Sequence, residues 1–195
     1  MTGAIILAGG SSSRLGTPKQ NLVYQGQTLL QRAVGTALAA GCKPVLVVLG
    51  ANADLIRPTI AGLPVNIVYN SDWEEGMASS TRLGIKVLKR TDPGLTSVIF
   101  MLCDQPFVNA SLLCELVQAK SKNGIAACAY NDTVGVPALF DAVYFDELLL
   151  LKGQEGAKKL LLKYREAVVS LPFPLGSVDI DTVEDYEKLN QAKAH

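Results

Sequence analysis

Short apolar runs alternate along the chain with longer segments in which apolar residues recur every three or four positions. Apolar runs bounded by Gly, Pro or polar residues are typical of buried strands, and they occupy residues 4–8, 44–50, 65–69, 97–103 and 124–130. Helical spacing marks the segments 28–41, 53–61, 79–90 and 112–120. Strands that alternate with helices predict an α/β fold, a doubly wound and mostly parallel (Rossmann-like) sheet flanked by helices.

Capping residues support several of these helices. Thr28 and Gln31 have the spacing of a capping box, and Gly41 is placed to stop the same helix. Asn109 is placed to cap the helix over 112–120, and Thr182 the last helix, which we expect over 181–194.

The regularity weakens after residue 130. We expect a strand at 136–140, helices at 144–151 and 155–167, and an edge strand at 167–173 near two prolines. The chain has no internal repeat and no linker-like composition. We therefore expect a single domain over 1–195, with a less regular insertion at 131–165.

Composition narrows the class of function. The 18 basic and 18 acidic residues balance to a formal net charge of zero, which argues against a nucleic-acid or anionic-membrane binder. No apolar run approaches the roughly 20 residues that span a bilayer. The N-terminus lacks the basic leading segment of a secretory signal, so we expect a cytoplasmic protein.

Histidine and cysteine usage excludes several chemistries. The single histidine is His195, the last residue, which argues against a Ser-His-Asp triad, a Cys-His pair or a histidine-ligated zinc. The four cysteines form no C-x-x-C pair, so we expect reduced thiols. Any catalysis must then rest on carboxylates, cationic side chains, hydroxyls or backbone dipoles.

The stretch LAGGSSSRLGTPKQ, residues 7–20, follows directly on the first predicted strand, where ligands of doubly wound sheets bind. Gly9 and Gly10 allow the backbone to approach an anion closely, and Arg14 and Lys19 add positive charge, which favours a polyphosphate ligand over an ordinary flexible turn. Neither G-x-x-x-x-G-K-[ST] nor G-x-G-x-x-G occurs in the chain. A different type of phosphate-binding loop is therefore expected.

The same stretch resembles the signature of the MobA-like nucleotidyltransferase superfamily: L-A-[AG]-G, then R-[LM]-G, then a P-K pair. Within it the chain is most similar to the molybdenum cofactor cytidylyltransferase branch. Further matches follow in the family's order: NSDWEEGMASSTRLGI (70–85), LCDQPFV (102–108), GVPALF (135–140), LKGQEGAKKLL (151–161) and DIDTVEDYEKL (179–189). The resemblance implies a nucleotidyltransferase fold and Mg²⁺-dependent transfer of CMP from CTP to the phosphate of molybdopterin, with release of pyrophosphate.

Acidic residues supply the expected metal site. Asp104 directly follows the run 97–103, at the carboxyl edge of a central strand, where it can hold Mg²⁺ through oxygen; a turn residue before a proline is the alternative. Asp179 and Asp181 alternate in an extended segment and would share one face. The resemblance assigns metal contact to Asp104 and Asp181, with Asp179 the weaker match.

The resemblance also implies a nucleotide site. Lys19 would offset charge on the α-phosphate in the transition state and Arg14 would hold the β- and γ-phosphates, so these two residues and Asp104 form the expected catalytic set. A helix that begins near its capping hydroxyls would offer free N–H donors to the base or ribose. The other nucleotide contacts implied are Leu7, Ala8, Gly9, Gly10, Asn70, Gly76, Ser79 and Ser80.

The acceptor would bind on the side of the insertion, and the residues implied for its pocket are Gly135, Pro137, Gly156 and Lys158. Gln154 and Lys158 stand where the family often has G-D-x-G-A-R, and Gly9 stands where the cytidylyl branch commonly has alanine. A guanylyltransferase, or an enzyme for another small phosphorylated acceptor, therefore stays open beside CTP and molybdopterin. A non-catalytic nucleotide-binding protein that delivers a cofactor is a third hypothesis, and a molybdoenzyme or its chaperone is the protein partner implied.

Overall fold

The fold is that of a computed structural model, which describes residues 1–120 and 124–191; His195 lies outside them. Its main sheet has seven strands in the order β5-β4-β1-β6-β8-β7-β9. The strands are β1 (Thr2–Ala8), β4 (Val45–Leu49), β5 (Asn66–Tyr69), β6 (Ser97–Leu102), β7 (Ile125–Tyr130), β8 (Thr133–Asp141) and β9 (Val168–Pro172). A separate ribbon pairs β2 (Val23–Tyr24) with β3 (Gln27–Thr28). Every predicted apolar run forms a strand of the main sheet.

The sheet is mostly parallel, as the alternation of strands and helices predicted. β1 pairs in parallel with both β4 and β6. β8 is antiparallel to both of its neighbours, β6 and β7. It follows β7 through a tight turn in which Asn131 and Asp132 have φ of 50° and 56°, the geometry of a hairpin. Part of the segment 131–165 therefore belongs to the sheet.

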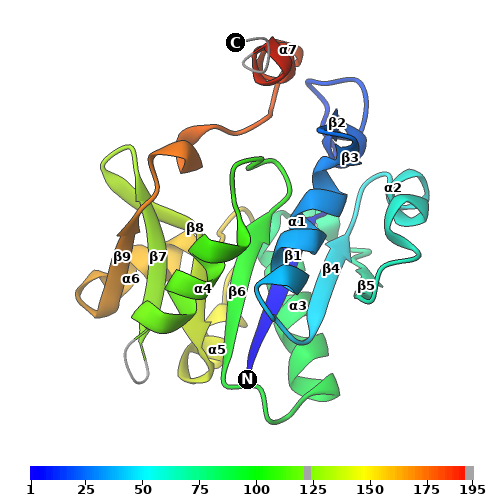
Figure 1. Ribbon diagram of the computed structural model, residues 1–195. Helices are drawn as coiled ribbons and strands as arrows, with labels where there is room; N and C mark the ends of the chain where they lie inside the picture. The colour runs from blue at the N-terminus through cyan, green and yellow to red at the C-terminus, as the bar shows by residue number, and fades with distance from the viewer. Residues whose placement is uncertain (121–123, 192–195) are drawn as a thin grey trace.

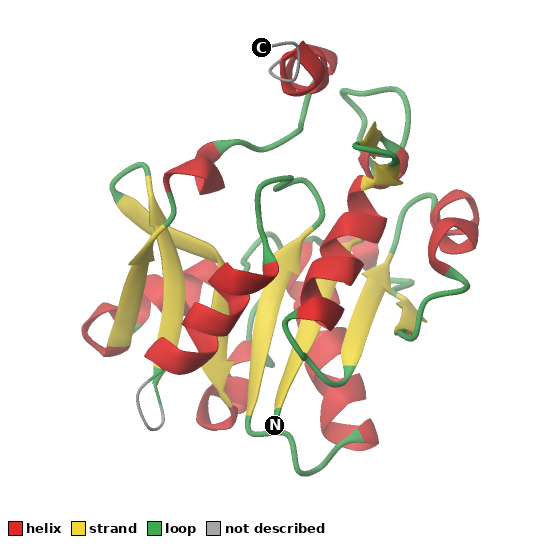
Figure 2. Cartoon of the chain, viewed as in Figure 1, coloured by secondary structure: helices red, strands yellow, loops and turns green. Residues whose placement is uncertain are grey.

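Helices cover both faces of the sheet (Figures 1 and 2). In Figure 1, α1 and α4 lie in front of the sheet, and α3, α5 and α6 lie behind it. The helices are α1 (Leu29–Ala39), α2 (Ala53–Ile60), α3 (Met77–Thr91), α4 (Ala110–Ala119), α5 (Phe145–Leu148), α6 (Lys158–Lys163) and α7 (Val183–Gln191). α5 and α6 are shorter than predicted: 3-10 turns include residue 144 and residues 165–167, and residues 149–151 and 155–157 are turns or irregular.

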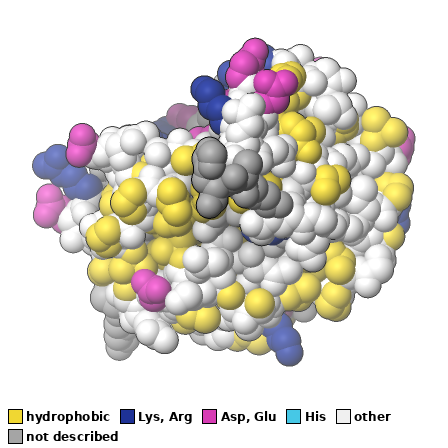
Figure 3. Space-filling model, turned by 45° about the horizontal axis from the view of Figure 1, so that its top comes forward, with side chains coloured by type: hydrophobic (Ala, Val, Ile, Leu, Met, Phe, Trp, Pro, Cys, Tyr) yellow, Lys and Arg dark blue, Asp and Glu magenta, His cyan; other side chains and the backbone are white. Residues whose placement is uncertain are grey.

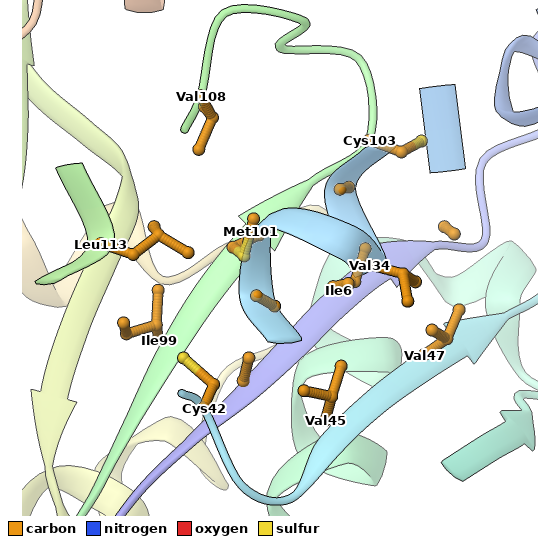
Figure 4. Close-up of a cluster of buried hydrophobic side chains, with 14 of the residues drawn as sticks. Ile6, Val34, Cys42, Val45, Val47, Ile99, Met101, Cys103, Val108 and Leu113 are labelled. Atoms are coloured by element: carbon orange, nitrogen blue, oxygen red, sulfur yellow. The ribbon is translucent and has the colours of Figure 1, made fainter. Parts of the chain in front are cut away.

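The central strands are buried on both faces, so alternate side chains enter different cores. Figure 4 shows Ile6 and Val47 of the sheet in the core that also contains Val34 of α1. Ile5 and Phe100 point to the other face, toward α3. Full burial of such a side chain stabilises the fold by roughly 1.5–3 kcal/mol. Because the strands are buried on both faces, their ends are held in place, and so are the first residues of the loops that follow them.

Several predicted helix signals are confirmed, and one is wrong. The confirmed caps are the capping box at 28–31 and the side chains of Thr182 and Asn109. Gly41 follows α1 with a φ of 76°, as a helix-stop glycine does. The hydroxyls near Ser79 do not begin their helix, because α3 starts two residues earlier, at Met77. The four cysteines are free thiols, as expected.

The C-terminal helix packs onto the β2–β3 ribbon, at the same end of the sheet as the loop after β1 (Figure 1). The Tyr186 hydroxyl donates to the Val23 carbonyl at 2.7 Å. Ile180 and Leu189 are buried together with Tyr24 of the ribbon. This contact fixes the segment before α7 beside the loop after β1, two parts of the chain far apart in sequence.

The surface shows charges of both signs. Figure 3 brings the top of the molecule in Figure 1 forward, and most basic side chains on that view lie beside acidic ones. Within residues 1–120 and 124–191, no helix has both the length and the apolar character needed to cross a membrane.

Candidate active site

A pocket of about 360 Å³ opens where β1 and β6 end. Its walls are the end of β1 with the loop after it, the end of β6, and the start of α3 with the turn before it. One residue of the loop between α5 and α6 completes the lining. The lining residues are Leu7, Ala8, Gly9, Gly10, Ser11, Lys19, Gln20, Trp73, Glu74, Gly76, Met77, Ser80, Leu102, Cys103, Asp104 and Gln154.

Lys19 lies in this pocket between two carboxylates. Its Nζ donates to Asp104 Oδ2 and, at 2.9 Å, to Asp181 Oδ1. Arg14 Nη2 donates to the other oxygen of Asp181 at 3.0 Å. The partners of Lys19 are 85 and 162 positions away in sequence. The fold thus brings into direct contact the four residues predicted to surround the triphosphate and the metal.

The charges of this cluster are mutually stabilised. Burial by itself would lower the pKa of Lys19, but the charge of Asp104 and the hydrogen bonds to both carboxylates raise it above its ordinary value. The hydrogen bond from Lys19, and then the charges of Lys19 and Arg14, lower the pKa of Asp181. Lys19 is therefore a cation and Asp181 an anion at neutral pH, which suits electrostatic stabilisation rather than proton transfer.

The two carboxylates also fit a divalent cation. Asp104 Oδ1 is buried and has no hydrogen-bond partner among the described residues, so an oxygen remains for a hard cation such as Mg²⁺. Asp181 is held beside it through Lys19. Across the described part of the chain, no group of three or more His, Cys, Asp and Glu side chains could hold a metal by itself. A metal here would need further oxygen ligands, such as phosphate or water.

Asp179 differs from Asp181 in its charge state. Burial, followed by the negative charges of Asp104 and Asp181, raises the pKa of Asp179 to about 6. A carboxyl group that is partly protonated near neutral pH is the weaker metal ligand, because metal ligands must be ionised. Asp181 is also the residue that shares Lys19 with Asp104, so it is the better placed of the two for that role.

Gln20 organises the loop after β1. Its side chain is 1% exposed, and Nε2 donates to the carbonyls of Ala8 at 2.9 Å and Gly10 at 3.2 Å. The Ser12 hydroxyl accepts from the backbone N–H of Lys19 at 3.0 Å. Because Gln20 engages both carbonyls, the loop presents fewer free acceptors that would repel a phosphate. Gln20 was missed in the sequence, since only the folded loop shows that this polar side chain is buried.

A second wall contains the serines predicted to contact the base. Asn70 Nδ2 donates to Ser79 Oγ at 2.8 Å and to Ser80 Oγ at 2.9 Å. Gly76 occupies the N-cap of α3, without a side-chain cap, and Ser79 Oγ donates back to the Gly76 carbonyl at 2.8 Å. Of these residues, Gly76 and Ser80 line the pocket, while Asn70 and Ser79 are buried behind its wall.

The residues predicted for the acceptor lie outside this lining. Gly135 and Pro137 are buried within β8. Gly156 packs against the lining residue Met77, since a Cβ at Gly156 would lie 2.5 Å from its sulfur. Lys158 is exposed at the start of α6. Their role toward an acceptor stays a prediction.

A larger pocket of about 910 Å³ adjoins the first and shares Ser11 and Trp73 with it. It lies over the ends of β4 and β5, and its charged lining residues among those described are Asp54 and Arg57. Lys19 and Asp104 line the smaller pocket, which is therefore the candidate active site. Asp181 bonds Lys19, and Arg14 bonds Asp181, from outside that lining.

Comparison with known proteins points to nucleotidyl transfer. The family model for the MobA-like NTP transferase domain matches residues 4–168. The nicotine blue oxidoreductase of Paenarthrobacter nicotinovorans is 29% identical over 95% of this chain and 94% of its own length. The molybdenum cofactor guanylyltransferase of Rhizobium meliloti (strain 1021) is 24% identical over 98% of this chain and 90% of its own.

Solved structures agree with the fold. The crystal structure of Rv0371c from Mycobacterium tuberculosis H37Rv has a TM-score of 0.84 and 34% identity, and the match covers 97% of both chains. A structure of Rv0371c in complex with manganese has a TM-score of 0.79 and 31% identity, over 98% of both chains. The mostly parallel sheet flanked by helices is thus the nucleotidyltransferase-like architecture expected from the sequence.

Proposed function

This chain belongs to the family of MobA-like NTP transferase domains, and on that basis we propose that it transfers a nucleoside monophosphate from a nucleoside triphosphate to a small phosphorylated acceptor, with release of pyrophosphate. The observation that carries the proposal is the contact of Lys19 with two acids: Lys19 and Asp104 both line the pocket at the strand ends, and Lys19 also bonds Asp181, which lies outside that lining. A cation can neutralise the charge of phosphates, and two adjacent acids can hold a metal that does the same. Such a set of side chains suits a reaction between two phosphate groups.

The proposed reaction requires the negative charges of the phosphates to be neutralised more than it requires a proton to be transferred. An oxygen of the acceptor phosphate attacks the α-phosphorus, and the bond from that phosphorus to the β-phosphate oxygen breaks, so pyrophosphate leaves. The second pKa of a phosphate monoester is near 6, so the nucleophile is already largely anionic at neutral pH. No general base is needed, which agrees with a pocket lined by no histidine among the described residues.

Lys19 and Arg14 supply the positive charge in this scheme. Lys19 stabilises the charge that develops around the α-phosphate, and Arg14 holds the β- and γ-phosphates that become the leaving group. The loop held by Gln20 would offer the backbone N–H groups of Gly9 and Gly10 to a phosphate, and the space beside Gly10 is open.

The acids would hold the metal. Asp104 and Asp181 are the proposed ligands of Mg²⁺, and the manganese complex of the structurally similar Rv0371c supports a divalent cation in this fold. When bound, such a cation supplies Lewis-acid polarisation of phosphate oxygens. Lys19 contacts both acids in the structure, so its charge would be next to the phosphates of a nucleotide whose metal these acids would hold.

For the substrates, we propose CTP and the phosphate of molybdopterin first, with GTP as the second nucleotide. The sequence motifs resemble those of the cytidylyl branch, whereas the Rhizobium relative is named a guanylyltransferase, and Gly9 matches the guanylyl pattern A-G-G. Gln154 and Lys158 depart from the family's acceptor pattern, so another small phosphorylated acceptor is the alternative to molybdopterin. A molybdoenzyme or its chaperone is the proposed protein partner.

The deciding experiment measures pyrophosphate release with each of the four ribonucleoside triphosphates, with Mg²⁺ or Mn²⁺, and with or without molybdopterin. We expect release with one nucleotide, dependent on both metal and acceptor. Asp104→Asn should abolish release while circular dichroism shows an intact fold, and full activity in that variant would refute the metal assignment.

The same assay separates the competing functions. A non-catalytic delivery protein would bind nucleotide tightly without releasing pyrophosphate. The oxidoreductase activity in the name of the Paenarthrobacter relative would instead appear as a change in the absorbance of a redox dye. Either outcome, with no pyrophosphate from any triphosphate, would overturn nucleotidyl transfer.

A further inference from the structure

The loop between α5 and α6 is fastened to the turn before α3 by a network around one arginine. Arg82 donates to both carboxylate oxygens of Glu75, at 2.8 and 2.6 Å, and to the Leu151 carbonyl at 2.7 Å. The Gly153 N–H donates to Glu75 Oε1 at 3.2 Å, and the Ala78 N–H donates to the Gly153 carbonyl at 3.1 Å. These bonds hold the loop 151–156, which the sequence assigned to the acceptor side, against the wall predicted to bind the nucleotide.

The loop can come this close because Gly76 has no side chain. A Cβ at Gly76 would lie 2.5 Å from the Gly153 carbonyl oxygen and 2.8 Å from the amide carbon and nitrogen of Gln154. The Gln154 side chain is exposed and lines the pocket together with Ser80. Its amide makes no hydrogen bond with any described residue, so its donor and its acceptor are both available to a ligand.

The charges of the lining residues around Gln154 indicate which part of a nucleotide would bind beside it. Among the described residues that line the pocket, Lys19 is the one cation, and it lies with Asp104, on the other walls. The wall around Gln154 carries an acid, Glu74, which would repel a phosphate. An uncharged polar group fits there, and in a nucleoside triphosphate that group is the base or the ribose.

We propose that Gln154 is a specificity-determining residue that reads the nucleobase, and that Glu75 and Arg82 are positioning residues that hold it there. A carboxamide offers a donor and an acceptor side by side, which matches the edge of a nucleobase better than the hydroxyls of a sugar. The proposal rests on the proposed function and moves one residue of the expected acceptor loop to the nucleotide.

The test compares nucleotide selectivity in matched variants of the full chain. Gln154→Met keeps the length of the side chain and removes both hydrogen-bonding groups. We expect kcat/KM for the preferred triphosphate, relative to the other three, to fall about tenfold, the effect of one hydrogen bond, while the KM of the acceptor stays unchanged. Lys152→Gln, an exposed change on the same loop, serves as the control and should leave the selectivity as it is.

A second variant tests the positioning network. Arg82→Met should lower the same selectivity, and combining it with Gln154→Met should add little, because both changes act through one contact. Thermal unfolding checks that each variant is folded. If Gln154→Met changes only the KM of the acceptor, or leaves selectivity untouched in an active enzyme, the proposal is overturned. If the parent protein releases no pyrophosphate from any triphosphate, the proposed function itself fails.

Discussion

Replacing Gln20 by methionine tests whether this side chain shapes the loop after β1, which we propose binds phosphate. Methionine has a similar length and volume, so the change creates no cavity. It removes the two donated hydrogen bonds and the one that Gln20 Oε1 accepts from Ser12 Oγ at 3.4 Å. The Gly10 carbonyl belongs to an exposed residue and can bond to water instead. The Ala8 carbonyl belongs to a residue only 2% exposed and loses a partner it cannot easily replace.

The magnitude follows from that one buried carbonyl. Leaving a buried acceptor unsatisfied costs about 1–3 kcal/mol in the free energy of unfolding. For a chain of this length, 1 kcal/mol shifts Tm by about 2–4 °C, so Gln20→Met should lower Tm by roughly 2–12 °C. Because the loop loses its internal support, we also expect the KM of the nucleotide to rise about tenfold, which corresponds to about 1.4 kcal/mol of binding.

The assays are thermal unfolding and steady-state pyrophosphate release, both with Gln31→Met as the control. Gln31 makes two side-chain bonds, accepting from the Thr28 N–H at 2.9 Å and donating to the Thr59 carbonyl at 2.8 Å, but it lies outside the pocket. Gln31→Met should lower Tm and leave the KM of the nucleotide unchanged. If Gln20→Met behaves like this control, the loop-shaping role of Gln20 is refuted.

Further predictions concern the cation and the wall of the pocket. Lys19→Ala should lower kcat about 100-fold or more and raise the KM of the nucleotide much less, because its charge matters most in the transition state; an equal effect on both would contradict that role. The bonds from Arg82 and Gly153 lower the pKa of Glu75 to about 2, so its contribution to stability is present above its ordinary pKa near 4.5 and is lost as the pH falls toward 2. The Tm difference between the parent and Glu75→Gln should accordingly be largest above pH 5 and close toward pH 2; a difference independent of pH would argue against the ion pair. Gly76→Ala meets both a φ of 120° and the Gly153 carbonyl, so urea unfolding should show a loss of about 1–3 kcal/mol, and an unchanged midpoint would contradict the close packing seen there.

The local sequence was sufficient to predict most of the secondary structure. Apolar runs such as VLVVL predicted their strands because burial on both faces of a sheet demands apolar residues at every position. Caps such as Thr28 and Asn109 were readable because a side chain that bonds to its own helix needs only a fixed spacing. The start of α3 was misread because Gly76 can take the N-cap without any side-chain bond, whereas the serines that resemble caps turn to Asn70.

The local sequence pattern could not predict the order and direction of the strands in the sheet. The run at 136–140 predicts a strand equally well in either direction, and only the hairpin with β7 makes β8 antiparallel. The resemblance named Lys19, Asp104 and Asp181 as members of one site, but it did not show how they meet. Lys19 bonds both acids because β6 ends next to β1 and because α7 packs on the β2–β3 ribbon.

By itself, the sequence determined which segments are buried and which loop follows the first strand, since both depend on the chemistry of neighbouring residues. The tertiary structure alone decided that Gln20 is a buried support of that loop and that Gln154 lines the pocket at the strand ends. A polar side chain has the same local pattern whether it points to water, to a carbonyl or into a pocket. Its role depends on what the rest of the chain places beside it, and that is set by packing between segments far apart in the sequence.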